Sequence, residues 1–266
     1  MITRLKELLF KNKSTRQTIT KNVFWLSMSQ VGSRLIRATI IIYAARVLGA
    51  GEYGVFSYVL GLAGFFTVFA DIGVNQILTR ETAAYPDQRT QYFSTSFWIK
   101  TVLLLFTVLL VIFVAPHVSK IEKISSLIPF VALLVISDGI REFSTAFLRG
   151  KEKMEWEAFI TITMNIAIVV AGFIILKISP TSKALLFSYI ASVAFSALLS
   201  IFVLRKQFIN IYYFNKNLAL KIINTCWPIA FLSMLGVFMF NTDMIMLGWW
   251  RTAEEIGFYS AGQRII

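Results

Sequence analysis

Four polar residues lie at helical spacing inside the first long apolar segment of the chain. They recur at steps of three, four and three residues and fall within an arc of about 80° on a helix: Ser27, Gln30, Arg34 and Arg37. At 1.5 Å per residue, Arg34 and Arg37 lie about 18 and 22 Å along that helix. Two guanidinium groups at this depth are suited to bidentate binding of a pyrophosphate or an acidic sugar. We therefore expect Gln30, Arg34 and Arg37 to line a binding cavity; pairing with carboxylates inside the bundle, or snorkelling of Arg37, is the alternative.

The second apolar segment carries an acid and an amide one helical turn apart, Asp71 and Asn75. Asp71 lies about 12 Å from the nearer end of its helix, within reach of Arg34. Three readings stay open: an Arg34–Asp71 ion pair, a role for Asp71 and Asn75 in a gated cavity, and closure of a helix by the Asp-Ile-Gly sequence that begins at Asp71.

Asp138 lies in the middle of the fourth apolar segment, with Arg141 and Glu142 three and four residues later. A lipid-facing charge at the centre of a membrane helix costs about 2.5–3.5 kcal/mol or more, so such groups face a cavity or a partner. Spacings of three and four residues put side chains on one helix face, which favours a local ion network. Lining of the cavity by Asp138 is the other interpretation.

These residues must be positioned by membrane helices. Of the 266 residues, 57% are hydrophobic and only 15% are charged, against about a quarter charged in soluble domains. Uninterrupted apolar stretches of about 20 residues span a hydrocarbon layer of about 30 Å. The sequence predicts an all-α, polytopic transmembrane bundle with spans at roughly 22–48, 55–79, 92–115, 127–149, 156–177, 184–204 and 222–248, and an eighth from 256 onward.

The net charge of +12 arises from basic residues beside the spans, where they set topology and meet anionic lipid headgroups. Lys and Arg gather before the first span and after the second, fourth and sixth, which predicts a cytoplasmic N-terminus. We expect contacts with the lipid bilayer and none with nucleic acid. The chain shows no P-loop and no catalytic set, so we expect no enzyme, no cofactor and no metal.

A short motif occurs twice, first in residues 43–58 and again in residues 246–261. Both copies contain Leu-Gly followed by Glu-x-Gly-x-aromatic-Ser, and the gap after Leu-Gly is two residues in one copy and six in the other. The copies are separated by about 200 residues, or six spans, so both lie in loops on the same outer side. This predicts a basic segment at 1–21, a complete six-helix unit at 22–215, and the start of a second, parallel unit at 216–266, in a protein longer than this chain.

The sequences ARVLGAGEYGVFSY and DIGVNQILTRETA, with NTDMIMLGWW and IGFYSAGQRI further on, resemble polysaccharide-biosynthesis flippases of the Wzx type. These belong to the multidrug/oligosaccharidyl-lipid/polysaccharide exporter superfamily. The resemblance implies two six-helix bundles around a central cavity and transfer of a polyprenyl-(pyro)phosphate-linked oligosaccharide from the inner to the outer leaflet of the cell membrane. It also implies alternating access, with other polysaccharide-assembly proteins as candidate partners.

Relatives of this kind couple transport to Na⁺ or H⁺ through carboxylates in the second bundle. The resemblance therefore makes Asp243, with Asn241, a candidate cation ligand. A helix cap, or a gate pair between Asp243 and Arg251, is the alternative.

Three other functions compete with the flippase. A multidrug or cation antiporter of the same superfamily would share the fold, although two intramembrane arginines favour an anionic substrate. A membrane enzyme acting on the same lipid would need a substantial outer loop bearing acid and base groups, and the connections here are short. A non-transporting scaffold of a polysaccharide-assembly complex would tolerate charge reversal at Arg34 and Arg37, whereas a transporter would not.

Overall fold

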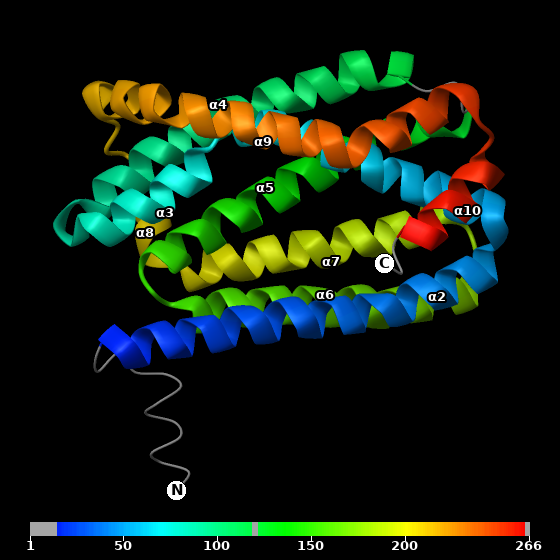
Figure 1. The fold of residues 1–266 in the computed structure, drawn as a ribbon, viewed down its shortest axis with the longest axis horizontal. Coiled ribbons are helices and arrows are strands. Elements are labelled where there is room, and N and C mark those ends of the chain that lie inside the picture. Colours follow the sequence, from blue (N-terminus) through cyan, green and yellow to red (C-terminus); the bar gives the residue numbers. More distant parts are fainter. Residues whose placement is uncertain (1–14, 119–121, 264–266) are drawn as a thin grey trace, which may run out of the picture.

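The computed structural model describes residues 15–118 and 122–263, and within them the regular structure is entirely helical. The predicted all-α bundle is thus confirmed. Most of the predicted basic segment, residues 1–14, and the last three residues of the predicted eighth span lie outside the described residues. The bundle is elongated (Figure 1). We call its two ends the Gly49 end and the Lys21 end.

The first long helix, α2 (Thr15–Ala70), contains both the first predicted span and most of the second. Gly49, with φ 69° and ψ 172°, interrupts the helical backbone, and the chain turns back there (Figure 1). A positive φ costs glycine little because glycine lacks a Cβ. The predicted loop at 49–54 is therefore wrong: the reversal takes place at Gly49, and the first copy of the motif continues as helix.

The second predicted span, 55–79, is not continuous. Helix α2 ends at Ala70, and α3 (Val74–Ala84) begins after Gly73, whose φ is 91°. The carboxylate of Asp71 accepts a hydrogen bond from the backbone N–H of Asn75 at 3.1 Å. Asp71 thus satisfies one of the N–H groups left free at the start of α3. Of the readings left open for the Asp-Ile-Gly sequence, closure of a helix is the one the backbone adopts.

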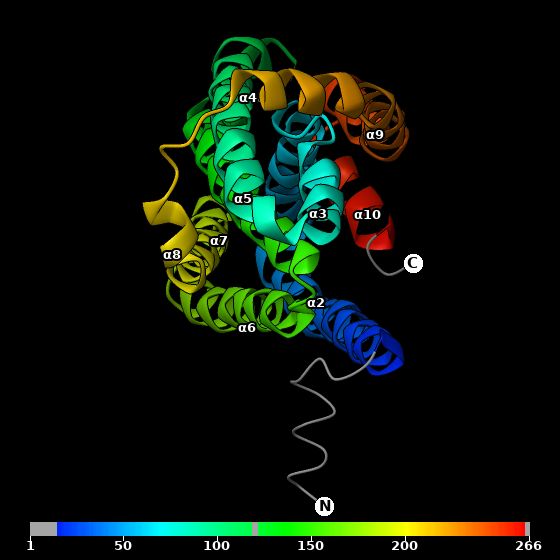
Figure 2. The same cartoon turned by 90° about the vertical axis from the view of Figure 1, so that its left-hand side faces the viewer.

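The remaining helices follow the predicted apolar segments closely. Residues 15–48 of α2 and α6 lie on one side of the bundle, and α4 and α9 lie on the other (Figure 2). The turn within the second motif copy falls at Arg251 and Thr252, between α9 and α10. The bounds are η1 Pro86–Gln88, α4 Arg89–Val118, η2 Glu122–Leu127, α5 Ile128–Gly150, α6 Met154–Ile178, α7 Ser182–Val203, α8 Arg205–Ile209, α9 Lys216–Trp250 and α10 Ala253–Gln263.

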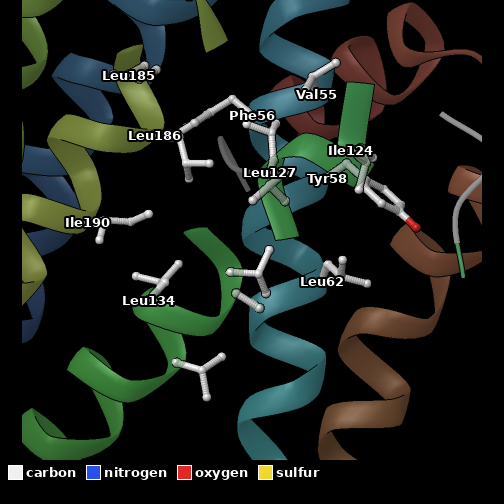
Figure 3. Packing of buried hydrophobic residues seen from close by; sticks show 14 of the residues in the cluster. Val55, Phe56, Tyr58, Leu62, Ile124, Leu127, Leu134, Leu185, Leu186 and Ile190 are labelled. Atoms are coloured by element: carbon white, nitrogen blue, oxygen red, sulfur yellow. The ribbon is translucent and has the colours of Figure 1, made fainter. Parts of the chain in front are cut away.

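Two apolar clusters form the core. The larger one occupies the half of the bundle nearer the Gly49 end and joins α2, η2, α5 and α7 (Figure 3), with Phe56, Leu62 and Leu134 among its buried side chains. The smaller one, with Phe93 and Phe143, lies nearer the Lys21 end. On α4 and α5, charged side chains lie between the two clusters, so a polar layer divides the core.

Five helices of the described residues are long and apolar enough to cross a membrane. They are α2, α4 with its preceding turn, α6, α7 and the first part of α9. The centre of α5 carries Asp138, Arg141 and Glu142, and this helix is not among the five. The chain is a multi-pass membrane protein.

Candidate functional site

A cavity of about 750 Å³ lies between the two limbs of α2, α6 and α7. Its wall is mostly apolar, with Arg34 and Arg37 as the two charged contributors. This volume falls in the range of about 300–1,000 Å³ that is typical of small-ligand sites. The remaining lining residues are Leu35, Ala38, Ile40, Ile41, Ile42, Ala44, Phe56, Leu60, Ile168, Leu185 and Tyr189.

Arg34 and Arg37 are brought together as the helical spacing predicts. Both side chains are exposed, and no ion pair involves either of them within residues 15–118 and 122–263. A guanidinium group carries five N–H donors and no acceptor, so its natural partner is a carboxylate or a phosphate. Two such groups at one cavity have the chemistry to bind an anion.

Three other residues that were predicted to face the cavity, Gln30, Asp71 and Asn75, do not line it. Gln30 is exposed on α2, one turn nearer the Lys21 end, and it is not a lining residue. The open possibility of an Arg34–Asp71 pair does not hold, because the carboxylate of Asp71 faces Lys100 instead, at 3.8 Å. Asn75 is buried beside Asp71 in α3.

A layer of five charged side chains crosses the bundle between the two apolar clusters. Arg141 donates to Asp138 from Nε and Nη2, at 2.9 and 2.6 Å, and lies 3.4 Å from Glu142. This is the local network that the spacing on α5 predicts for Asp138. Asp71 at the end of α2 and Lys100 in α4 complete the layer.

Lys100 is the member that sequence reasoning missed. Its side chain is only 3% exposed, and it lies inside the predicted third span, 92–115. Helix α4 begins at Arg89, so Lys100 lies eleven residues inside a membrane helix, about 16 Å from its start. Counting residues from the start of the predicted span would have identified Lys100 as an intramembrane cation.

Asp243 and Asn241 do not converge on a common site. The carboxylate of Asp243 accepts hydrogen bonds from Tyr259 and, at 3.1 Å, from Gln263, both on α10. Asn241 instead packs against Gly64 of α2. The gate pair with Arg251 is also absent in the part of the chain that is described, since Arg251 pairs with Glu255. Coupling through Asp243 stays a prediction.

Near the Lys21 end, a buried carboxylate, Glu81, connects α9 to α3 and α4. It accepts hydrogen bonds from Arg80 and from the hydroxyl of Tyr92, and lies 3.8 Å from Lys221 of α9. Burial by itself raises the pKa of a carboxyl group, but these donors and the nearby cations outweigh it. The pKa of Glu81 is therefore below its ordinary value of 4.5.

Comparison with known proteins identifies the family of this chain. The profile of the family described as "Polysaccharide biosynthesis protein" matches residues 19–266, nearly the whole sequence. The match includes both copies of the repeated motif and, among the described helices, everything except the first four residues of α2.

Two curated relatives are assigned as O-antigen transporters. The protein from Escherichia coli (strain K12) is 26% identical over 165 residues, which is 60% of this chain and 39% of that protein. The protein from Shigella dysenteriae is 21% identical over 249 residues, or 92% of this chain and 62% of that protein. The chain therefore spans less than two thirds of the length of these relatives.

Two solved structures share the fold, each with a TM-score of 0.60 over 97% of this chain and 65% of theirs. One is a MOP superfamily transporter from Pyrococcus furiosus Vc1 (DSM3638), described by the reverse polarity of its binding pocket, at 11% identity. The other is a multidrug resistance MATE family transporter of the MOP superfamily in an outward-facing conformation, at 12% identity. Fold and sequence agree with the resemblance to Wzx-type flippases, and the chain belongs to the polysaccharide biosynthesis protein family.

Proposed function

We propose that this chain is part of a flippase that moves a polyprenyl-(pyro)phosphate-linked oligosaccharide from the inner to the outer leaflet. The observation that carries the proposal is the cavity with two arginines, Arg34 and Arg37, that form no ion pair with any described residue. A pyrophosphate bridge or an acidic sugar supplies the anionic partner that these groups lack. The polyprenyl tail stays in the surrounding lipid.

The apolar wall of the cavity favours a ligand that is not purely ionic. Apolar side chains of α2, α6 and α7 surround the two arginines, and such a site lowers the local dielectric and strengthens each charged contact. The assignment of both curated relatives as O-antigen transporters supports a glycan-bearing substrate. Transport proceeds by alternating access, with residues 15–48 of α2 moving relative to α9.

The distribution of Lys and Arg supports a definite orientation. The Lys21 end carries most of the basic residues and faces the cytoplasm, and the Gly49 end faces the outer side of the cell membrane. Substrate therefore enters from the Lys21 end.

Charge reversal tests the proposal directly. The protein to assay is the full-length gene product in proteoliposomes, with transfer of a fluorescent lipid-linked oligosaccharide between leaflets as the readout. We expect Arg34→Glu and Arg37→Glu each to lower the rate about tenfold or more, because a hydrogen bond to a charged group contributes about 1.5–3 kcal/mol. The matched control is Arg46→Glu, since Arg46 is exposed on the same helix limb but does not line the cavity.

Two results would overturn the proposal. Unchanged lipid transfer in both folded variants would favour a scaffold role. Transport of cationic dyes without transfer of lipid-linked glycan would identify an antiporter.

A further inference from the structure

Three basic residues are gathered at the Lys21 end, around the turn that joins α5 to α6 (Figure 1). Lys151 and Lys153 lie in that turn, and Arg89 is the first residue of α4. Within residues 15–118 and 122–263, none of the three forms an ion pair. We call these three residues the turn cations.

Thr82, near the end of α3, is the common neighbour that brings Arg89 to the turn. Its carbonyl oxygen accepts a hydrogen bond from Nε of Arg89 at 2.9 Å, which leaves the two Nη groups for other acceptors. A Cβ on Gly150, the residue before Lys151, would stand 2.7 Å from the Cβ of Thr82. The start of α4 and the start of the α5–α6 turn are therefore packed against the same residue of α3.

The backbone of the turn is fixed, so the two lysines have defined positions. Their N–H groups each donate to a carbonyl in the last turns of α5, at 3.0 Å. Between them, Glu152 adopts φ 57° and is the one non-glycine residue with a positive φ among those described. This is the left-handed conformation that commonly ends a helix, usually at glycine. A strained residue of this kind persists only where its surroundings hold it, and such residues cluster at binding sites.

Lys21 of α2 holds the turn from the other side. Its side chain is 1% exposed, and Nζ donates to the carbonyl oxygen of Glu152 at 3.3 Å and to the carboxylate of Glu155 at 3.1 Å. Glu157, in the same turn of α6, is paired with Arg149. The two acids that begin α6 are thus engaged by other cations and do not neutralise the turn cations.

The turn cations act on one another more than any carboxylate acts on them. Burial and the charges of Lys153 and Arg89 hold the pKa of Lys151 below its ordinary value of 10.5. Glu152 and Asp87 are the acids closest to them in sequence; both are exposed and neither forms an ion pair with a described residue. An anion placed among the three cations would relieve their mutual repulsion.

The surroundings of the turn cations are those of a lipid headgroup region. They lie at the ends of α4 and α6, two of the helices that are long and apolar enough to cross a membrane. Trp156, in the first turn of α6, is 42% exposed and packs edge-on against the exposed ring of Phe159. Exposed tryptophan side chains are typical of the membrane–water interface. Nζ of Lys151 lies 5.4 Å from the ring centroid of Phe147, so its aliphatic stem runs over an apolar surface.

We propose that the turn cations bind the phosphate group of an anionic phospholipid in the leaflet at the Lys21 end. Arginine and lysine N–H groups donate charge-assisted hydrogen bonds to phosphate oxygens, and arginine can do so with two N–H groups at once. The exposed rings of Trp156 and Phe159 lie beside the acyl chains of the same lipid. The site is separate from the arginine cavity, and it does not rest on the proposed transport function.

Binding of a soluble, short-chain phospholipid tests the site without any transport assay. The purified full-length gene product in a neutral detergent is titrated in parallel with dioctanoyl phosphatidylglycerol, dioctanoyl phosphatidylcholine and inorganic phosphate. The rise in melting temperature gives an apparent Kd for each. We expect saturable stabilisation by phosphatidylglycerol alone. A Lys or Arg near the headgroup contributes a factor of about five, so Lys151→Gln and Lys153→Gln should each raise that Kd about fivefold.

Two variants show whether the lipid occupies this site. Lys206→Gln is the matched control, because Lys206 is an exposed lysine of α8 at the same end of the bundle. Arg34→Glu separates the turn cations from the arginine cavity. Both variants should leave the Kd for phosphatidylglycerol unchanged. If Lys151→Gln fails to fold, Lys153→Gln decides the question, since the side chain of Lys153 is exposed.

Four results would overturn the proposal. The first is a wild-type protein that shows no saturable stabilisation by phosphatidylglycerol. The second is equally tight binding of phosphatidylcholine or of inorganic phosphate. The third is an unchanged Kd in folded Lys153→Gln. The fourth is a loss in Lys206→Gln as large as that in Lys153→Gln, which would mean that diffuse positive charge attracts the lipid.

Discussion

Gly54 and Gly257 lie at the point where the backbones of α2 and α10 touch. A Cβ on Gly54 would stand 1.7 Å from the carbonyl oxygen of Ala253 and 2.9 Å from the amide nitrogen of Gly257. A Cβ on Gly257 would stand 2.0 Å from the carbonyl oxygen of Ala50. These are equivalent glycines of the two motif copies, so the copies pack against each other reciprocally at the Gly49 end.

We predict that Gly54→Ala and Gly257→Ala each destabilise the protein. The added methyl group meets backbone atoms that cannot rotate away, and overpacking of this kind costs typically about 1–3 kcal/mol. The measurement is thermal unfolding of the purified full-length gene product, followed by tryptophan fluorescence.

Gly51→Ala provides the control for helix propensity. Gly51 lies in the same helix, and no atom lies within 4 Å of the place that an added methyl group would occupy. Alanine favours helix by about 1 kcal/mol over glycine, so we expect Gly51→Ala to be neutral or stabilising. An equal effect of Gly51→Ala and Gly54→Ala would show that close packing is not why the motif carries glycine.

The equivalent glutamates of the two motif copies accept hydrogen bonds from different helices, which gives a second prediction. The carboxylate of Glu52 reaches the start of α7, where it accepts from the N–H and hydroxyl of Ser182 at 2.9 and 2.5 Å. Glu255 caps its own helix through Thr252. Loss of a charged partner at a helix N-terminus costs about 0.5–2 kcal/mol. Glu52→Gln should therefore lower the melting temperature more than Glu255→Gln; the reverse order would contradict the inter-helix role of Glu52.

The sequence predicted the helices of this bundle well because apolar length dominates their formation. It also predicted that the two motif copies lie on the same side. It could not predict that a single glycine replaces a loop at residue 49, and it left a helix end at Asp71 as only one of three readings. Both depend on local backbone conformation, φ 69° at Gly49 and φ 91° at Gly73, and glycine adopts positive and negative φ about equally readily.

The candidate site was predictable only where its residues share one helix. Arg34 and Arg37 face one cavity because helical spacing alone places them together, and Asp138 pairs with Arg141 for the same reason. The Asp71–Lys100 pair joins different helices, so no spacing rule relates its members. Such a pair follows from how the helices pack, which apolar periodicity does not specify.

The ion pairs at the Lys21 end predict a pH dependence of stability. Because the pKa of Glu81 is lowered in the folded protein, its ionised form stabilises the fold above the unfolded pKa, near 4.5, and this contribution is lost as the pH falls through the folded pKa. The difference in melting temperature between wild type and Glu81→Gln should shrink below about pH 4.5. A difference that is constant with pH would mean that Glu81 acts through packing alone.

The pair formed by Asp71 and Lys100 is best tested by a double-mutant cycle. The side chain of Lys100 is 3% exposed and lies 3.8 Å from Asp71, and removal of one member of a buried ion pair costs about 3–5 kcal/mol because the other charge is left uncompensated. We expect Asp71→Asn and Lys100→Met each to lower stability strongly. The double variant should recover much of that loss, since no uncompensated charge then remains at the helix break. Additive losses in thermal unfolding would show that the two side chains act independently, and that the charge of Lys100 is balanced instead by the carboxylates of α5.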